Sequence, residues 1–558
     1  MSGFTMNGKC LAVLFVVLLL VGSLAVACGQ TEEPDVDDPS ADEPPAEQDP
    51  DDDDDDEYLI GDVLILAQGS DPLTMAPQEH RNSATAAVQA NVFEGLIYHG
   101  TFDQPLLAHD WEQVDDFTWK FYLRDDVVFH DGEPFTAVDV KYTFEDLQRD
   151  NERSPSRGTW EDRLSHVEIV DDFTVKFHLN TIVPPQVFFT DLGSYAGYIV
   201  PKHYHEEVGP EYAAANPIGT GPYVVAHWAR DDRMELEFFE DHWRVFDPVF
   251  KKAIHRAIPE ASTRMAEVMT GGVHFTLPIP TTEYERIAHS DYADPIRMDT
   301  TRILHWEMYH GLIDGEPAAT ADLRVRQAID YAIDNQTLVD AVLDGFGVPV
   351  MGYFGEDLGG GNQRMFGTIP GMDGEYRFDI DRAKELLSEA GYAEGELAIH
   401  VDGCRGRYPH DSDVSEIVAE AMLPLAGINT TLRILDWGPY NQEVRTPGGM
   451  THMALSGHSP GLDVGTGMLG RFRRHYAWQE YQNDEMFDLL YRACETAEGM
   501  DAEHREALIQ EAQQIAMEDL PEIRLYRVVN LYARHRGLDW DPPLSENTSF
   551  NIWQMARR

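Results

Sequence analysis

The segment from Trp111 to Leu147 constrains the fold more than any other part of the sequence. In its first part, apolar residues alternate with polar ones, at Phe117, Trp119, Phe121 and Leu123. In its last part, apolar residues recur at helical spacing, at Ala137, Val140, Phe144 and Leu147. Between them, Asp131-Gly132 predicts a turn, and Thr136 followed by Asp139 fits a helix N-cap with an acidic partner. The segment therefore predicts a strand, a turn and an amphipathic helix in close succession.

The first 28 residues resemble a bacterial lipoprotein signal. Lys9 precedes an unbroken apolar run from Leu11 to Val21, and small residues then lead to Cys28. The pattern predicts a signal peptide over residues 1–27 and a lipid on Cys28, which would become the mature N-terminus. It departs from the usual pattern because the aliphatic Leu24 stands one place early. An uncleaved membrane anchor is the alternative, and either one places the body outside the cytoplasm.

Residues 28–57 are predicted to be a disordered tether. Sixteen of them are Asp or Glu, none is Lys or Arg, and prolines are scattered among them. Such a segment cannot bury enough apolar surface to offset its ordering entropy, and self-repulsion keeps it extended. Calcium binding by Asp51 to Asp56 is a weaker alternative, because an unbroken run lacks the spaced ligands of a calcium loop.

The acidity extends to the rest of the chain. The formal net charge is -57, and residues 58–558 carry -42 of it. Only eight of the 42 basic residues are lysines. An acidic, lysine-poor surface suits concentrated salt, where screening shortens the range of repulsion, so we expect a halophilic or salt-tolerant host. The absence of a basic stripe excludes nucleic acid as a partner.

About 500 residues follow the tether, which is too long for one hydrophobic core and predicts two or three domains. Two cysteines, Cys404 and Cys494, lie in this part. Outside the cell they could form a disulfide that closes a large loop. Two buried thiols are the alternative, and Cys494 continues an apolar helical pattern that suits a core position. The sequence leaves both open.

Several further segments, taken in order, resemble one known family. They are Asn91–Leu96 (NVFEGL), Asn216–Tyr223 (NPIGTGPY), Pro259–Gly272, Asp322–Leu343 (DLRVRQAIDYAIDNQTLVDAVL), Asp381–Gly391 and Asp436–Gly457. Together with Trp111–Leu147 they are similar to the family 5 solute-binding proteins, which serve ABC importers of oligopeptides, dipeptides, nickel and some oligosaccharides. Gly219 and Gly221 are expected to permit unusual backbone angles before an apolar strand.

The resemblance implies an α/β, two-lobed periplasmic-binding-protein-like fold with an additional domain inserted in the first lobe. The first lobe would take residues 58–98, 218–302 and 526–558, the inserted domain 99–217, and the second lobe 303–525. The solute would bind between the lobes and favour their closure.

No catalytic residue, metal site or cofactor is predicted. HExxH and P-loop nucleotide-binding patterns are absent from the sequence. His203 and His205 could bind a metal, but their tract resembles a surface helix of the family. The resemblance gives His130 a structural role.

The resemblance implies a monomer that captures a small solute and delivers it to ABC permease and ATPase subunits. A peptide is the favoured solute, and an oligosaccharide or a metal chelate is the alternative. Two other functions stay open. One is a sensor that presents the ligand to a membrane receptor, and the other is a secreted lipoprotein enzyme.

Candidate ligand-binding residues follow from the expected cleft. They are Ser70, Asp71, Trp306, Trp437, His458, Ser459, Gly461 and Asp463. Peptide-binding members pair the peptide's amino terminus with an Asp, and Gly461 stands at that position here. Asp463 could restore the pairing if the loop shifts by two residues, or it could cap a turn. Trp306 and Trp437 could line the cleft or pack in the core.

Overall fold

The computed structural model describes residues 60–80, 82–98, 104–350, 377–446, 448–459, 463–472, 478–541 and 551–558. The predicted signal peptide, Cys28, the acidic tether and Gly461 lie outside these residues. All described residues belong to one compact unit, Asp55–Arg558.

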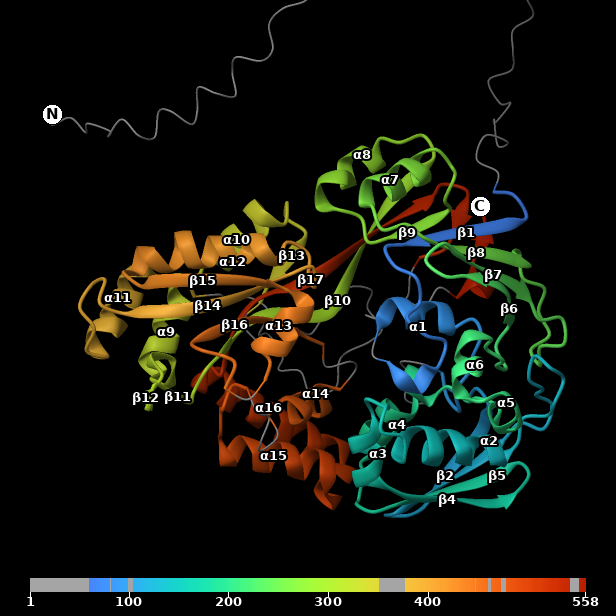
Figure 1. The fold of residues 1–558 in the computed structure, drawn as a ribbon. Coiled ribbons are helices and arrows are strands. Elements are labelled where there is room, and N and C mark those ends of the chain that lie inside the picture. Colours follow the sequence, from blue (N-terminus) through green and yellow to red (C-terminus); the bar gives the residue numbers. More distant parts are fainter. Residues whose placement is uncertain are drawn as a thin grey trace, which may run out of the picture. The chain divides into compact units, whose positions relative to one another are not determined.

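Within the described residues, one mixed sheet of eleven strands runs through the body (Figure 1). Its two longest strands, β10 (Ala293–Met308) and β17 (Glu522–His535), pair antiparallel along their length. β17 pairs at one end with β9 (Phe275–Leu277), and β10 pairs at the other with β16 (Met453–His458). These two strands therefore connect the two halves of the sheet.

The first half of the body is built around β1, the strand nearest the N-terminus. Its strands are β9, β1 (Val63–Gln68), β8 (Lys252–Ala257), β7 (Arg233–Phe238) and β6 (Tyr223–Ala229), in spatial order. Its helices are α1 (Ser83–Gln89), α7 (Ala261–Met269) and α8 (Tyr284–Ala288), with 3-10 turns at Pro77–Glu79 and Thr281–Glu283. The short pair β18 (Leu538–Asp539) and β19 (Ala556–Arg557), with a 3-10 turn at Ile552–Gln554, completes it. β1 pairs in parallel with both β8 and β9, so the strand is buried in the middle of this half.

The second half surrounds the other end of the sheet. Its strands are β16, β14 (Ala398–Arg405) and β15 (Asn429–Asp436), with β13 (Gly347–Pro349) added to β17 and a small pair β11 (Leu312–Ile313) and β12 (Glu316–Pro317). Its helices are α9 (Leu323–Ala332), α10 (Asn335–Val342), α11 (Ile380–Glu389), α12 (Asp411–Ile417) and α13 (Trp437–Glu443). Short turns at Ala319–Ala321, Val418–Met422 and Leu423–Ala426 accompany them. The expected helical segment from Asp322 to Leu343 is two helices, because the backbone is extended at Ile333 and Asp334 caps the second.

A separate antiparallel sheet forms a module between β1 and β6 in the sequence. Its strands are β2 (Ala108–Asp115), β3 (Thr118–Leu123), β5 (Thr174–Leu179) and β4 (Leu164–Asp171), in spatial order. Its helices are α2 (Ala137–Lys141), which continues as a π-helix over Tyr142–Arg149, α3 (Arg157–Arg163), α4 (Pro185–Leu192), α5 (Lys202–Val208) and α6 (Pro210–Ala215), with a 3-10 turn at Tyr195–Gly197. We call these elements the four-stranded module.

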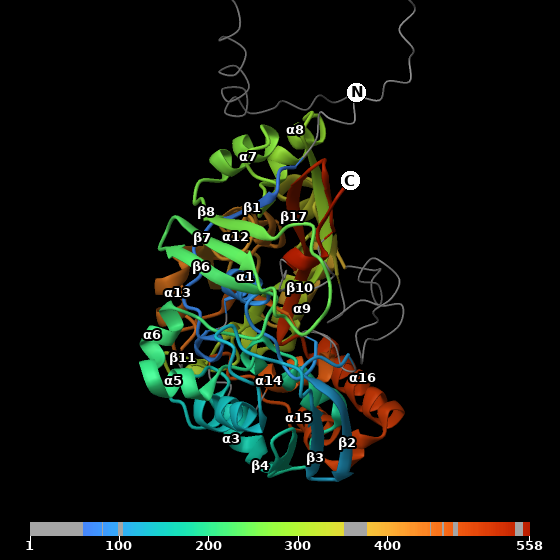
Figure 2. The same cartoon turned by 90° about the vertical axis from the view of Figure 1, so that its right-hand side faces the viewer.

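Helices from the C-terminal part pack against this module. They are α14 (Val464–Phe472), α15 (Asp484–Glu495) and α16 (Ala502–Asp519), with a 3-10 turn at Ala497–Met500. Apolar residues of these helices share one core cluster with β3, β5 and α4 of the module. α15 lies beside the module in both views (Figure 1 and Figure 2). Segments far apart in sequence thus meet in one core, and Arg163 also contacts Glu495 across 332 positions.

The segment that begins at Trp111 folds as its pattern predicts, with one exception. Trp119, Phe121 and Leu123 are buried on one face of β3, whereas Phe117 lies before the strand and is exposed. The carboxylate of Asp139 accepts hydrogen bonds from the backbone N–H of Thr136 at 3.0 Å and from its hydroxyl at 3.3 Å. This capping box starts α2 at the expected residue.

Gly219 and Gly221 are required for close packing, and the expectation of unusual backbone angles there is wrong. Positive φ angles occur at other glycines but not at these two. A Cβ on Gly219 would lie 2.0 Å from the carbonyl oxygen of Val92, and one on Gly221 would lie 2.6 Å from its carbonyl carbon. The turn therefore sits directly on the chain that follows α1, where no side chain has room.

The disulfide between Cys404 and Cys494 does not form. Both thiols are free and buried, and they belong to different core clusters, one in the second half and one beside the module. Burial raises the pKa of the Cys494 thiol to about 12. Of the two alternatives left by the sequence, the structure has the pair of buried thiols.

Candidate functional site

A cavity of about 250 Å³ lies where β10 and β17 pass between the two halves. The first half contributes Ala84, Ala87, Leu277 and Pro278, the two long strands contribute Thr300, Arg302, Val528, Asn530 and Tyr532, and the second half contributes Arg407, Tyr408 and Pro409. Its volume is many times the roughly 10–15 Å³ that one water molecule needs, which suits a small solute.

An irregularity in β10 shapes the floor of this cavity. The pairing of β10 with β17 shifts register between Asp299 and Ile303. There the hydroxyl of Thr300 donates to the carbonyl oxygen of Val528 at 2.7 Å, and the backbone N–H of Arg302 donates to the same hydroxyl at 3.1 Å. The bulge thus replaces ladder hydrogen bonds with side-chain ones at the point where both strands cross the cavity.

Asp411 holds the loop that forms the wall from the second half. Its buried carboxylate accepts backbone N–H groups from Gly406 at 3.3 Å, Arg407 at 2.8 Å and Tyr408 at 3.0 Å. Three hydrogen bonds to one carboxylate fix the backbone of this loop after β14 ends. The side chains of Arg407 and Tyr408 are therefore presented from a rigid backbone.

Tyr408 is the centre of an aromatic and cationic group. Its hydroxyl accepts the N–H of Gly457 at 2.8 Å and lies 3.3 Å from the Gly457 carbonyl oxygen, and its ring meets Trp437 edge-on at 6.2 Å. The guanidinium carbons of Arg302 and Arg407 lie 5.9 Å and 5.5 Å from the centre of the Tyr408 ring. Both cations are thus gathered at one buried aromatic side chain.

The lining contains basic residues in an acidic protein. Among the lining residues that the structure describes, two are arginines and none is Asp or Glu. The whole chain has 99 acidic residues against 42 basic ones, so this local balance is the reverse of the average. An arginine presents five N–H donors in a fork that fits a carboxylate or phosphate.

Three of the predicted ligand-binding residues lie near this cavity. Trp437 packs beside Tyr408, and its ring is also stacked on Tyr440 at 5.8 Å. The hydroxyl of Ser459 lies 2.5 Å from that of Thr301 in the β10 bulge. His458 pairs with Ile303 in the sheet, and burial is the main reason why its pKa is well below the usual value.

The other predicted residues lie elsewhere. Trp306 is completely buried in the core of the second half. Ser70 is exposed, and the carboxylate of Asp71 accepts the indole N–H of Trp228 at 3.1 Å. Gly461 is outside the described residues. These side chains are not among those that line the cavity.

Asp463 is held by a buried arginine. Its two carboxylate oxygens accept hydrogen bonds from Arg505 at 2.7 and 2.8 Å, and both side chains are completely buried. One oxygen also accepts the backbone N–H of Thr466 at 2.7 Å, which caps the start of α14. This is the capping arrangement that the sequence left open for Asp463.

Sequence reasoning missed Arg302, Arg407 and Tyr408. A usable signal was present, because Arg405 and Arg407 stand close together after a strand in a chain that is poor in basic residues. Loops after strands often carry binding residues. Arg302 had no comparable signal, since its place in the cavity depends on the β10 bulge.

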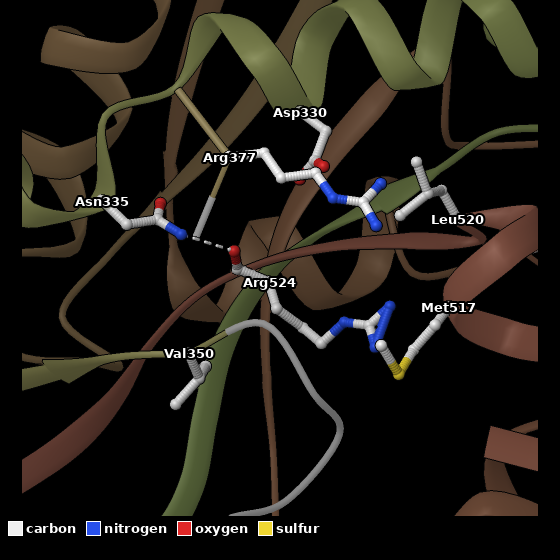
Figure 3. Close-up of a pocket in the computed structure, with 7 residues that line it drawn as sticks. All are labelled: Asp330, Asn335, Val350, Arg377, Met517, Leu520 and Arg524. Carbon is white, nitrogen blue, oxygen red and sulfur yellow. Dashed lines mark hydrogen bonds between the residues drawn. The ribbon is translucent and has the colours of Figure 1, made fainter. Parts of the chain in front are cut away.

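A second, smaller cavity of about 30 Å³ lies in the second half (Figure 3). It has room for only about two water molecules. Asp330, Arg377 and Arg524 face it, and Asn335 donates to the carbonyl oxygen of Arg524 at 3.0 Å. Burial raises the pKa of Asp330 to about 6.

The possible metal ligands His203 and His205 are among the described residues, whereas the alternative of an uncleaved membrane anchor concerns the first 28 residues, which lie outside them. Among the described residues, no group of three or more His, Cys, Asp or Glu side chains is arranged to bind a metal ion. His203 lies on the surface helix α5 and contacts Asp131 at 2.8 Å, while His205 packs on Tyr142. No helix in this part of the chain combines the length and the apolar character needed to span a bilayer.

Comparison with known proteins identifies the family. The profile of bacterial extracellular solute-binding proteins, family 5 (middle), matches residues 104–480. The dipeptide-binding protein of Escherichia coli K12 is 26% identical over 367 residues, which cover 60% of this chain and 64% of that protein, just under two thirds of its length. The glutathione-binding protein GsiB of Salmonella paratyphi A is 24% identical over 498 residues, covering 86% of this chain and 92% of that one.

Solved structures agree on the fold. The substrate-binding protein CtaP of an ABC transporter from Listeria monocytogenes superposes with a TM-score of 0.76 at 21% identity, covering 89% of this chain and 99% of that one. This similarity supports the two-lobed α/β fold that the sequence predicted. The matched profile covers more than half of the chain, and the chain therefore belongs to the family 5 bacterial extracellular solute-binding proteins.

Proposed function

We propose that this protein is the solute-binding component of an ABC importer and that it captures a small solute in the cavity between its two halves. The observation that carries the proposal is the position of the 250 Å³ cavity at the crossing of β10 and β17. A solute there would contact both halves at once, so it would favour the closed arrangement over an open one. The halves would act as the two lobes, joined by these strands.

A peptide-sized acid is the solute that we favour. The related proteins from E. coli and Salmonella paratyphi A are described as binding a dipeptide and glutathione. The cavity has room for a compact molecule of this kind. Arg302 and Arg407 would hold its acidic group, Tyr408 and Trp437 would cover its body, and Ser459 would lie beside the β10 bulge.

The identity of the solute is best tested on material that stays bound. Protein purified gently from its own cells should retain a small molecule that mass spectrometry can identify. Calorimetry with that molecule should give saturable binding, and the molecule should be recovered unchanged after incubation. Chemical turnover of the molecule would instead support an enzyme.

The role in import needs a cellular test. Deleting the gene should abolish uptake of the radiolabelled solute, and restoring the gene should recover it. Normal uptake combined with a lost chemotactic or transcriptional response would contradict import and support a sensor. Size-exclusion chromatography should give the mass of a monomer.

We also propose that Cys28 carries a lipid that holds the protein on the outer face of the cell membrane. Each buried CH₂ contributes roughly 0.8 kcal/mol, so stable attachment needs more than one acyl chain. Cells fed labelled palmitate should label the wild-type protein, and Cys28→Ser should remove the label and release the protein or leave it unprocessed. A soluble, unlabelled wild-type protein would contradict the anchor.

A further inference from the structure

Side chains of both halves meet at one hydroxyl group beside the cavity, that of Thr281. Thr281 begins a 3-10 turn of the first half, three residues after Pro278 of the cavity lining, and is only 9% exposed. Its hydroxyl donates at 2.8 Å to the carboxylate of Asp344, which follows α10 in the second half. Nε2 of His410 lies 3.3 Å from the same hydroxyl oxygen. His410 directly follows Pro409, which lines the cavity, so this cluster joins the two halves at the cavity wall.

The backbone is unusual at both second-half residues of this cluster. Asp344 has a φ of 50° and His410 a φ of 54°, so both are left-handed. Asp and His adopt this conformation more often than most residues, and such conformations are frequent at ligand clamps and switch regions. Among the described residues, six other than glycine have a positive φ, and two of these six contact Thr281. Two left-handed residues thus place their side chains on one hydroxyl group of the other half.

The hydrogen-bond roles call for a proton on each ring nitrogen of His410. Nδ1 lies 2.9 Å from the carboxylate of Asp413, and an ionised carboxylate only accepts. The hydroxyl of Thr281 has one proton, which it donates to Asp344, so it can only accept from Nε2. A neutral ring would turn a lone pair towards one of these two oxygens and lose that contact. The protonated ring completes both.

Acidic groups near His410 come from three elements. On α12, Asp413 binds the ring, whereas Asp411 accepts three backbone N–H groups of the preceding loop. After α10, Asp344 is connected to the ring only through the shared hydroxyl. On the first-half turn, Glu283 pairs with an arginine of α8. The side chain of His410 is 29% exposed, so its ring can exchange protons with the solvent.

We infer that His410 is a proton-dependent link between the two halves of the body, in which its protonated ring joins Asp413 of the second half to Thr281 of the first. An ordinary histidine changes charge between pH 5 and 8, so the link forms on the acid side of this range and weakens on the alkaline side. The rings of Tyr284 and Phe346, whose centres lie 4.7 Å apart, also join the halves through an apolar contact. The polar contact at His410 is the part that a proton can switch.

This link would regulate the solute site. It fastens the second-half wall, which ends at Pro409, to the first-half turn that follows Pro278. Fastening the walls favours an arrangement in which a solute touches both of them. The affinity for the solute should therefore be about threefold to tenfold higher at pH 5.5 than at pH 8.0, which is the range of one hydrogen bond. This consequence rests on the proposed function, whereas the link itself does not.

A double-mutant cycle tests the link without a solute. Thr281→Val removes the hydroxyl, and His410→Asn removes the ring but keeps a residue that tolerates a left-handed backbone. Urea unfolding is measured for the wild type, the two single variants and the double variant at pH 5.5 and 8.0. At pH 5.5, Thr281→Val should lower the folding equilibrium constant about threefold to tenfold more in the wild type than in His410→Asn. At pH 8.0 the two losses should be equal.

The same measurements show how the link could fail. Equal losses at pH 5.5 would overturn the link, and an undiminished difference at pH 8.0 would overturn its dependence on a proton. His504→Asn is the matched control, because His504 also pairs with a carboxylate, that of Glu498 at 3.1 Å, but both lie in the C-terminal part. This substitution should leave the cost of Thr281→Val unchanged at both pH values. A control that changes this cost as much as His410→Asn would overturn the assignment to His410.

Retained material tests the regulation of the solute site. Protein purified from its own cells is dialysed at pH 5.5 and at pH 8.0, and mass spectrometry measures the small molecule that stays bound. The wild type should retain about threefold more or better at pH 5.5, and the ratio should be smaller in His410→Asn, which controls for titration of the molecule itself. Equal ratios would overturn the regulation. No retained molecule at either pH, with the coupling of Thr281 and His410 intact, would count against the proposed function and support the link.

Discussion

At the scale of single residues, His130 shows how burial and hydrogen bonding fix one protonation state. Its Nε2 donates to the carbonyl oxygen of Gly221 at 2.8 Å, and its Nδ1 accepts the backbone N–H of Gly219 at 3.3 Å. A carbonyl can only accept and an N–H can only donate, so the ring must be neutral with its proton on Nε2. Burial lowers the pKa of His130 to about 4.

Acid should therefore destabilise the protein through His130. The folded-state pKa of His130 lies below the unfolded value of about 6.5. Its contribution to the free energy of unfolding is therefore fully present above pH 6.5 and is lost as the pH falls towards 4. The free energy of unfolding would fall by about 3 kcal/mol through this residue. Urea unfolding at pH 7.5, 5.5 and 4.5 should show a smaller pH dependence for His130→Gln than for the wild type. His289→Gln is the control, because His289 is exposed. If the free energy of unfolding of His130→Gln depended on pH as strongly as that of the wild type, the assignment would be contradicted.

Asp463 and Arg505 form a completely buried ion pair, so removing one partner should be costly. Asp463→Asn should lower the free energy of unfolding by about 3–5 kcal/mol, because Arg505 would keep a buried charge without its partner. Arg505→Gln should act similarly, and the double variant should lose less than the two single losses added together. Solute affinity should not change. Weaker binding in Asp463→Asn at unchanged stability would instead make Asp463 a ligand for the solute.

At the scale of elements, the turn before β6 depends on contact between two backbones. Gly219→Ala would place a methyl group 2.0 Å from the carbonyl oxygen of Val92, so the turn must move. We expect a loss of about 1–3 kcal/mol in the free energy of unfolding, as for other overpacked sites. Gly158→Ala is the control, because its Cβ would meet nothing within 4 Å in helix α3. It should be neutral or stabilising by up to about 1 kcal/mol. Equal melting temperatures for the two variants would contradict the packing argument.

Elements with a strong local pattern could be predicted from the sequence, and their placement could not. Trp119, Phe121 and Leu123 alternate because one face of β3 is buried, and Asp139 caps α2 through neighbours in sequence. The cavity instead joins residues that are far apart, such as Ala84, Arg302 and Arg407. Their meeting depends on the β10 bulge and on the loop that Asp411 holds, and neither leaves a periodic signal. Asp463 was ambiguous for the same reason, since its partner Arg505 lies 42 residues away.

At the scale of the whole molecule, a buried ion pair connects the module with the C-terminal helices. Arg163 in α3 contacts Asp191 in α4 and also donates to Glu495 in α15 at 2.9 Å. The chains approach closely there, because a Cβ on Gly499 would lie 2.7 Å from Pro184. The same segments share one core cluster, so this ion pair supports the packing of the C-terminal helices on the module.

Glu495→Gln should therefore weaken the packing of α15 on the module. The free energy of unfolding should fall by about 1–3 kcal/mol, because the buried Arg163 would lose one of its two charged partners. Urea unfolding of the variant and the wild type measures this loss. Glu498→Gln is the matched control, since Glu498 is exposed and pairs with Arg492 and His504 on its own side. Equal losses in the two variants would contradict a contribution from the buried ion pair.

The net charge should make the stability of the whole body depend on salt. Residues 58–558 carry -42, so like charges repel each other in the folded state more than in the expanded unfolded state. The Debye length falls from about 10 Å at 0.1 M salt to about 3 Å at 1 M, which screens this repulsion. Surface pairs such as Lys252 with Glu237 lose attraction under the same conditions, but exposed pairs contribute little. The melting temperature should therefore rise from 0.1 to 2 M KCl. Sucrose of equal osmolality is the control, because it is excluded from the protein surface but does not screen charges. An equal rise of the melting temperature in sucrose, or no rise in KCl, would contradict the electrostatic explanation.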